Sequence, residues 1–248
     1  MTVGDVDAAL GPGYGSSLKE VQFKPMFGFT TANQCINLHK ILCIPVIVAC
    51  MCVYKNFTLP ALMYLFAHGT YSIMWLVKYA TYPPKNFETD LTAANYIVTF
   101  FLVGLYWLTP WILCKTAFSI NPILMMVSLF IYQAGIFMHY VSDCQLHYTL
   151  LYRGSGLVKT GLYARTRNPG YLGEILIYIG YALLAQHWLP WLVNCFFWFG
   201  LFRDNMNKKE KSISRHPGWQ EYKAQSWQLL PKPWGPPVNG NGYIKIGS

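Results

Sequence analysis

A dense group of side chains that could bind a charged ligand lies between residues 142 and 174. Asp143 is followed by Arg165 and Arg167, and an apolar run begins a few residues later. Arginine offers paired donors to phosphate or carboxylate, and free amide groups at the start of a helix add positive potential. These residue types, in this order, favour a binding site for an anionic ligand. The alternative is that the arginines only anchor the chain at a membrane surface.

Glu174 lies just inside the apolar run, where a carboxylate is costly unless it is paired or hydrogen-bonded. Gly170 and Gly173 precede it and allow the backbone to approach a ligand closely. The alternative is an acid that merely stabilises a helix N-terminus. Because Asp143 is also expected at a helix end, we interpret the two carboxylates as parts of one site.

A second group of polar residues lies in an apolar stretch nearer the N-terminus. His68, Tyr71 and Lys78 are spaced by three and seven residues, which places them on one face of a helix. Polar groups in such a stretch usually face a cavity or a partner, and a tyrosine hydrogen-bonded to a neighbour can donate a proton. The alternative is helix packing for His68 and Tyr71 and an interfacial position for Lys78.

Composition indicates which elements must position these residues. The chain has 248 residues, of which 54% are hydrophobic and 12% are charged, whereas soluble domains carry about 25% charged residues. We therefore predict an all-α, polytopic transmembrane helix bundle with about six spanning helices. The expected spans are residues 36–54, 59–80, 93–114, 121–141, 171–187 and 188–202.

Charge patterning predicts the topology of this bundle. With six spans, all but two of the 19 lysines and arginines, namely Lys55 and Lys115, fall on one side, which places both termini in the cytosol. The net charge of +9 then reflects topology and anionic lipid head groups, and we expect no nucleic-acid partner. The seven cysteines form no C-x-x-C pattern, and we expect neither a disulfide framework nor a metal site.

The same patterning divides the chain into four regions. Residues 1–30 are a polar cytosolic segment, and residues 31–141 form an N-terminal transmembrane bundle that is the candidate substrate region. Residues 142–231 contain a loop, two helices and a cytosolic amphipathic segment, which Pro217 divides, and the family resemblance described below implies that they form a cofactor-binding region. Residues 232–248 are rich in proline, glycine and asparagine and are expected to be a flexible tail.

The run from Asn168 to Glu174, NPGYLGE, resembles the RHPNYLG[DE]-type motif of membrane sterol reductases. Residues 140–231 also resemble the C-terminal domain of steroid 5-alpha-reductases, which carries a Ser-Asp-x-x-Leu element followed by Gly-Leu. The matching residues are Ser142, Asp143, Leu146, Gly161 and Leu162. Isoprenylcysteine and phospholipid methyltransferases share a shorter motif, RHPxYxG, and generally lack the Ser-Asp element.

The resemblance implies a cytosol-facing NADPH pocket, with S-adenosylmethionine as the alternative cofactor. The implied cofactor-binding residues are Asp143, Arg153, Tyr163, Arg165, Arg167, Asn168, Tyr171, Glu174, Lys208, Lys209 and Tyr222. The candidate catalytic residues are His68, Tyr71 and Glu174. The methyltransferases tend to have paired glutamates where this chain has the run KKEK at 208–211, and lysines suit the phosphates of NADPH better than a sulfonium. A basic patch that binds lipid head groups is the other interpretation of these lysines.

Two positions depart from the motif. Asn168 stands at its usual histidine and Gly170 at its usual asparagine, so the expected polar contact shifts to Asn168. The leading hypothesis is an NADPH-dependent reductase of a carbon–carbon double bond in a steroid, sterol or other lipid, in the endoplasmic reticulum. The alternatives are a methyltransferase of a lipid or isoprenylcysteine and a non-catalytic scaffold or lipid-binding protein. The expected partners are a lipid or sterol-like substrate and membrane lipids, and the sequence does not indicate an oligomeric state.

Overall fold

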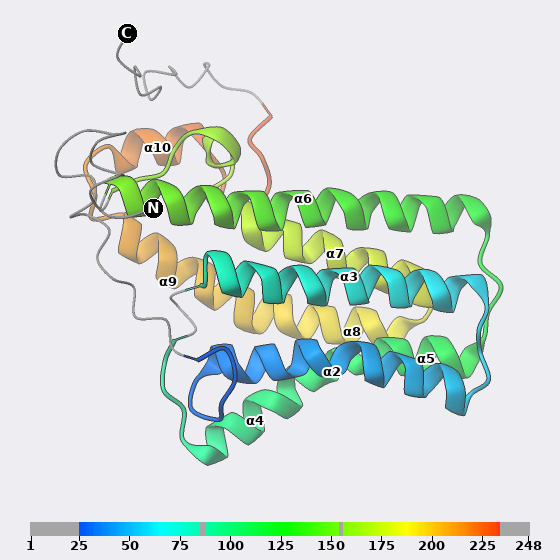
Figure 1. Ribbon diagram of the computed structural model, residues 1–248. Helices are drawn as coiled ribbons and strands as arrows, with labels where there is room; N and C mark the ends of the chain where they lie inside the picture. Colours follow the sequence, from blue (N-terminus) through cyan, green and yellow to red (C-terminus); the bar gives the residue numbers. More distant parts are fainter. Residues whose placement is uncertain (1–24, 85–87, 154–155, 234–248) are drawn as a thin grey trace, which may run out of the picture. The chain divides into compact units, whose positions relative to one another are not determined.

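The computed structural model describes residues 25–84, 88–153 and 156–233, and the regular secondary structure in these ranges is helical (Figure 1). Two isolated bridges join Thr31 to Asp90 and Thr166 to Trp227. This confirms the predicted all-α class. Most of the predicted N-terminal segment 1–30 and of the predicted tail 232–248 lies outside the described residues.

The helices follow one another with short connections. The N-terminal half contains α2 (Ala32–Val53), α3 (Leu59–Thr81), α4 (Ala93–Gly104), the 3-10 turn η2 (Leu105–Trp107) and α5 (Leu108–Thr116). The C-terminal half contains α6 (Pro122–Arg153), η3 (Gly161–Ala164), α7 (Pro169–Ala185), α8 (Trp188–Phe196), the π-helical η4 (Phe197–Phe202), α9 (Arg203–Ile213) and α10 (Trp219–Gln225).

Local sequence signals account for several helix ends. The Thr31 hydroxyl accepts a hydrogen bond from the Gln34 amide at 3.2 Å, and the Gln34 side chain accepts one from the Thr31 amide, which forms a capping box at the start of α2. Between α9 and α10, Pro217 cannot continue a helix and Gly218 has φ 78°, a left-handed conformation suited to glycine. The predicted division of the C-terminal segment at Pro217 is therefore confirmed.

Helices occur at all six positions predicted to span the membrane. Three candidate spans have both the length and the hydropathy to cross a bilayer, namely Ala32–Val53, Ala93–Thr116 and Pro122–Arg153. These support a membrane protein, whereas α7 is apolar but has only 17 residues. The total of six spans, the cytosolic termini and the endoplasmic reticulum remain predictions.

The fourth helix is longer than predicted. We expected it to end near residue 141, but α6 continues to Arg153 and includes Ser142, Asp143 and His147. Hydropathy marks where the apolar run ends, whereas a helix continues until its backbone is interrupted, and no proline or glycine occurs between Val141 and Gly154. Asp143 therefore lies on a helix rather than after one.

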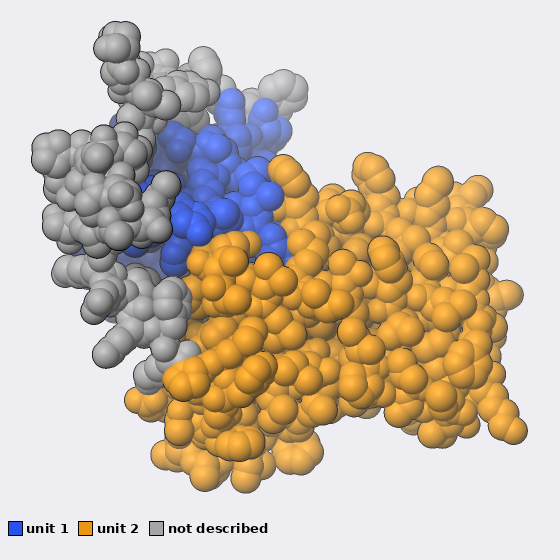
Figure 2. All heavy atoms as spheres, in the orientation of Figure 1, with its two compact units in different colours: residues 1–23, 138–172, 203–248 blue, residues 24–137, 173–202 orange. Residues whose placement is uncertain are grey.

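The chain forms two compact units, coloured blue and orange in Figure 2. Unit 1 comprises residues 1–23, 138–172 and 203–248, and unit 2 comprises residues 24–137 and 173–202. Each unit combines segments that are far apart in sequence. The four regions proposed from the sequence remain predictions.

Unit 2 contains the packed transmembrane helices, with α2 against α3, α4 and α5. Glycines bring α6 and α7 together here: a Cβ atom at Gly135 would lie 2.6 Å from the Gly173 oxygen and 2.7 Å from the Ile177 nitrogen. A Cβ atom at Gly180 would lie 2.9 Å from the Ser128 oxygen. Small residues that allow such backbone contact are typical of helix packing in membranes.

Candidate functional site

The residues predicted to be functional are divided between the two units. Unit 1 holds Asp143, Arg153, Tyr163, Arg165, Arg167, Asn168, Tyr171, Lys208, Lys209 and Tyr222. Unit 2 holds His68, Tyr71 and Glu174. Each group is therefore described by itself.

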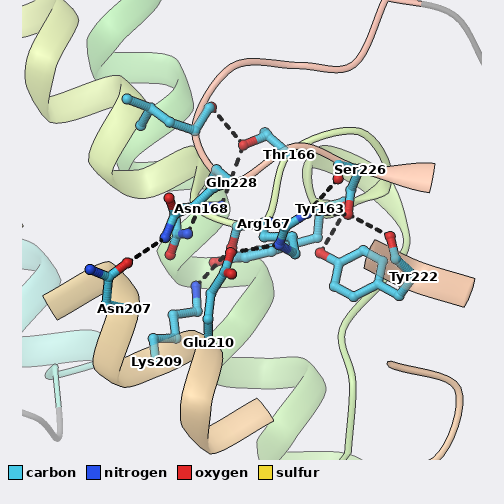
Figure 3. Close-up of polar contacts among 11 residues, drawn as sticks. Tyr163, Thr166, Arg167, Asn168, Asn207, Lys209, Glu210, Tyr222, Ser226 and Gln228 are labelled. Carbon is cyan, nitrogen blue, oxygen red and sulfur yellow. Dashed lines mark hydrogen bonds and ion pairs between the residues drawn. The ribbon is translucent and has the colours of Figure 1, made fainter. Parts of the chain in front are cut away.

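Arg167 is the centre of the contacts in unit 1 (Figure 3). Its side chain is 6% exposed, and its Nε donates to the Glu210 Oε1 at 2.6 Å in an ion pair. Its Nη1 donates to the Ser226 carbonyl oxygen, and the guanidinium lies 5.5 Å from the centroid of the Trp219 ring. These contacts direct the guanidinium toward α9, α10 and the segment that follows them.

Residues 226–232 form a strap along residues 165–168. The Arg167 amide donates to the Trp227 oxygen at 2.9 Å, and the Trp227 and Lys232 amides donate to the Arg165 oxygen at 3.2 and 2.9 Å. The Thr166 hydroxyl donates to the Leu229 oxygen at 2.7 Å. The strap therefore fixes the backbone of the motif just before α7.

Two tyrosines extend this network toward α6. The Tyr222 hydroxyl donates to the Tyr163 oxygen at 2.9 Å, and the Tyr163 hydroxyl donates to the Ser142 oxygen at 3.4 Å. Burial raises the pKa of both phenols, and the nearby Asp143 carboxylate raises the pKa of Tyr163 further. Both hydroxyls are therefore protonated donors at neutral pH and hold the motif segment in place.

Lys209 joins α9 to the same segment. Its Nζ donates to the Arg167 oxygen at 2.9 Å and lies 5.1 Å from the centroid of the Tyr163 ring. Burial lowers the pKa of Lys209 to about 8, although Asp143 and Glu210 attract the ammonium and oppose this shift. This amine is therefore partly neutral near physiological pH and can still donate its hydrogen bond.

The depressed pKa of Lys209 predicts that the protein becomes more stable as the pH rises from about 8 to 10.5. In this window the folded state has released the proton, whereas the unfolded chain, with the ordinary pKa of 10.5, still holds it. Chemical unfolding in micelles at several pH values should show this rise, and Lys209→Met should flatten it. The exposed neighbour Lys208 is the control, because Lys208→Met should keep the slope. An unchanged slope in Lys209→Met would contradict the assignment.

At Gly170, the backbone of α7 lies close to side chains of α6. A Cβ atom here would lie 2.9 Å from the Asp143 Oδ1 and 3.2 Å from the Ser142 Oγ. The Gly170 oxygen is 3.1 Å from the His139 Nδ1, and the His139 Nε2 is 3.9 Å from the Asp143 Oδ2. The asparagine of the motif would therefore displace the Asp143 carboxylate, which gives the glycine at this position a steric reason.

The remaining predicted residues of unit 1 differ in exposure. Arg153 and Lys208 are exposed, whereas Arg165 and Tyr171 are half-buried. Asn168 is 1% exposed, and its amide group donates to the Gln228 oxygen at 2.9 Å. Its Oδ1 is buried and has no hydrogen-bond partner among the described residues. A buried acceptor of this kind can receive a hydrogen bond from a ligand.

In unit 2, His68 is completely buried among aromatic rings. Its Nδ1 is 2.9 Å from the Tyr64 hydroxyl, and its ring stacks on Tyr181 at 4.7 Å between centroids. The His68 Nε2 has no partner among the described residues. Tyr71 lies 6.4 Å from His68 between ring centroids, and the hydroxyl that lies within hydrogen-bond distance of the imidazole belongs to Tyr64.

Glu174 belongs to a charged group inside unit 2. It attracts the ammonium of Lys40, which is 4% exposed and lies 4.1 Å from the centroid of the Tyr71 ring. The Lys78 Nζ lies 4.6 Å from the centroid of the Trp75 ring. Glu174 is half-buried, and this carboxylate in an apolar run therefore has a cation within electrostatic range. Among the described residues, no group of three or more histidine, cysteine, aspartate or glutamate side chains has the arrangement of a metal site.

Comparison with known proteins identifies the family. A family model described as "Protein of unknown function (DUF1295)" matches residues 85–226, more than half of the chain. The chain belongs to the DUF1295 family. This is the family of steroid 5-alpha-reductase-like proteins, so the resemblance noted in the sequence is confirmed at the level of the family, and the branch remains a prediction.

One curated relative of this DUF1295 protein shares a short, similar stretch. "Uncharacterized protein C7D4.09c" of Schizosaccharomyces pombe is 54% identical over 37 residues, which are 15% of this chain and 14% of the relative. The aligned part thus spans only a small fraction of the relative's length. The activity, substrate and partners of this protein therefore do not follow from this relative.

Sequence reasoning missed four residues that the structure places at these sites. Tyr64 lies four residues before His68, and this spacing on a helix is a signal that was available. Lys40 occurs inside an apolar run, which also marks a residue with a special role. Glu210 and Ser226 had no such signal, because their contacts with Arg167 span 43 and 59 residues.

Proposed function

We propose that this DUF1295 protein is a membrane-embedded reductase that uses NADPH to reduce a carbon–carbon double bond in a steroid, sterol or other lipid. Such a reaction adds a hydride to one carbon and a proton to the other. NADPH, when bound, supplies the hydride. The protein must then bind and orient the lipid, exclude water and provide the proton.

The buried pair of His68 and Tyr64 is the observation that carries this proposal. When the Tyr64 hydroxyl donates to Nδ1 at 2.9 Å, the neutral imidazole holds its proton on Nε2. That nitrogen is buried and has no partner among the described residues, so its proton is available to a substrate. The rings of Tyr64 and Tyr181 pack around the imidazole and keep water away. This arrangement suits a general acid in an apolar site.

Side chains of unit 1 suit the binding of NADPH. Lys208 is an exposed cation that can contact a phosphate group of NADPH. The Asn168 Oδ1 is an unpartnered acceptor that can receive a hydrogen bond from a carboxamide. Arg167 would act indirectly, because its donors hold Glu210 and Ser226 and so keep Asn168 in position.

The first experiment asks which cofactor binds. NADPH should raise the melting temperature of the purified full-length protein by several degrees, whereas S-adenosylmethionine should leave it unchanged. Lys208→Ala should weaken NADPH binding about tenfold through the loss of one phosphate contact. Lys223→Ala is the matched control, since Lys223 is also exposed on a cytosolic helix and is expected to leave binding unchanged.

A transfer assay then tests the reaction itself. NADPH carrying deuterium at its transferable position should place that deuterium in a lipid product, detected by mass spectrometry of a lipid extract. If S-adenosylmethionine alone raised the melting temperature and its methyl group entered a lipid, the protein would be a methyltransferase rather than a reductase. Protection by neither cofactor would reject both enzymes in favour of a scaffold or lipid-binding protein.

A further inference from the structure

Unit 2 holds a buried ammonium group that the proposed reduction does not use. Lys40 of α2 is 4% exposed. The described residues surround its Nζ with two aromatic faces, Tyr71 at 4.1 Å and Trp75 at 5.6 Å from the ring centroids. A cation–π contact offsets only part of the cost of removing an ammonium from water. The aromatic rings alone therefore do not compensate this charge.

The charges near Lys40 do not include an ion-pair partner for its ammonium. Glu174 attracts the Lys40 ammonium, and Lys78 repels it. Among the described residues, no carboxylate forms an ion pair with the Lys40 Nζ. A single buried ammonium matches a ligand group with one negative charge, such as a carboxylate, better than a phosphate dianion.

Two histidines near Lys40 also carry polar atoms that need partners. His39 and His68 both lie within electrostatic range of Lys40. Both nitrogens of His39 and the Nε2 of His68 are buried without a hydrogen-bond partner among the described residues. Buried polar atoms in a helix bundle are normally satisfied. These three nitrogens provide an observation, independent of Lys40, that indicates a polar ligand group in this part of unit 2.

We propose that unit 2 binds a lipid that carries one carboxylate, with the carboxylate at Lys40. The apolar part of such a lipid suits the hydrocarbon environment of the helices, and its head group supplies the negative charge that Lys40 lacks. This names a substrate class for the proposed reductase. It rests on the proposed function only in regarding the bound lipid as the substrate.

The test measures binding without turnover. Tritiated oleate is bound to the purified full-length protein in phosphatidylcholine nanodiscs, with empty discs as background. Methyl oleate has the same chain but no charge, and we expect it to compete at least tenfold more weakly than unlabelled oleate. Acetate has the carboxylate without the chain and should not compete. Equal competition by the ester would overturn the proposal, and competition by acetate would assign the site to small carboxylates.

Two lysine variants compare a buried with an exposed ammonium. Lys40→Met should weaken oleate binding about tenfold or more, because the charge is lost. Methionine has a similar shape and removes the charge from the space beside the Tyr71 and Trp75 rings. Lys115→Met is the matched control, since the Lys115 Nζ also lies on an aromatic ring, Trp111 at 4.9 Å, but is exposed. Unchanged binding by Lys40→Met would overturn the site.

Glu174→Gln provides a test in the opposite direction. Removing the carboxylate that attracts Lys40 should tighten oleate binding several-fold, whereas a purely structural role of Glu174 would weaken it or leave it unchanged. Weaker binding in Glu174→Gln would contradict the proposal even if Lys40→Met failed to fold. Oleate binding that follows these rules without deuterium transfer from NADPH would reject the reductase and keep the lipid-acid site. Deuterium transfer from NADPH without selective oleate binding would reject the lipid-acid site and keep the reductase.

Discussion

Arg167→Ala should destabilise unit 1 by about 3–5 kcal/mol, because it leaves a partly buried Glu210 carboxylate and the Ser226 carbonyl without their donor. The consequence should be local. The strap at residues 226–232 is held by backbone bonds from the amides of Arg167, Trp227 and Lys232, and it should detach more often. Hydrogen exchange at these three amides, measured by mass spectrometry of strap peptides, should therefore become faster.

Two controls separate the effect of losing the Arg167 contacts from a general effect of charge. Arg203→Ala removes an exposed arginine of α9 and should change neither stability nor exchange by more than about 0.5 kcal/mol. A double-mutant cycle with Glu210→Gln should show coupling of at least about 1 kcal/mol, since the two side chains are 2.6 Å apart. If Arg167→Ala bound NADPH less well while exchange at the strap stayed unchanged, Arg167 would be a direct cofactor contact instead.

His68→Phe should lower the turnover of the proposed reduction by about 100-fold or more, the usual contribution of a positioned general acid. Phenylalanine preserves the aromatic stack on Tyr181 but offers no proton. Single-turnover transfer of deuterium from NADPH to the lipid is the measurement, because it isolates the chemical step from product release. NADPH binding should stay unchanged.

Tyrosine variants show whether the hydrogen bond of His68 matters. Tyr64→Phe should reduce turnover less than His68→Phe and shift the pH profile, because it removes the group that orients the imidazole. Tyr132→Phe is the matched control, since its buried hydroxyl donates to the Ala67 oxygen at 2.7 Å and touches neither member of the pair. Full activity in His68→Phe with an unchanged melting temperature would show that another group donates the proton.

Much of the fold was predictable, because apolar runs and chain breakers act locally. Helices occur at the six apolar runs, and Pro217 with Gly218 separates α9 from α10. The end of α6 was not predictable from hydropathy, since many polar residues extend a helix as readily as apolar ones. The motif at 168–174 likewise indicated the family.

The sequence alone determined the helical class and indicated candidate residues for chemistry, and the tertiary structure decided what each of them touches. Arg167 was predicted to bind an anionic ligand, but its guanidinium contacts Glu210 and Ser226 of the chain itself, which lie 43 and 59 residues away. Tyr71 was expected to accompany His68, but the hydroxyl of Tyr64 is the one that reaches the imidazole. Local patterns report the period of a helix and not its rotation or its neighbours. Hydrogen bonds and ion pairs are short-range, so only the packing of distant segments selects their partners.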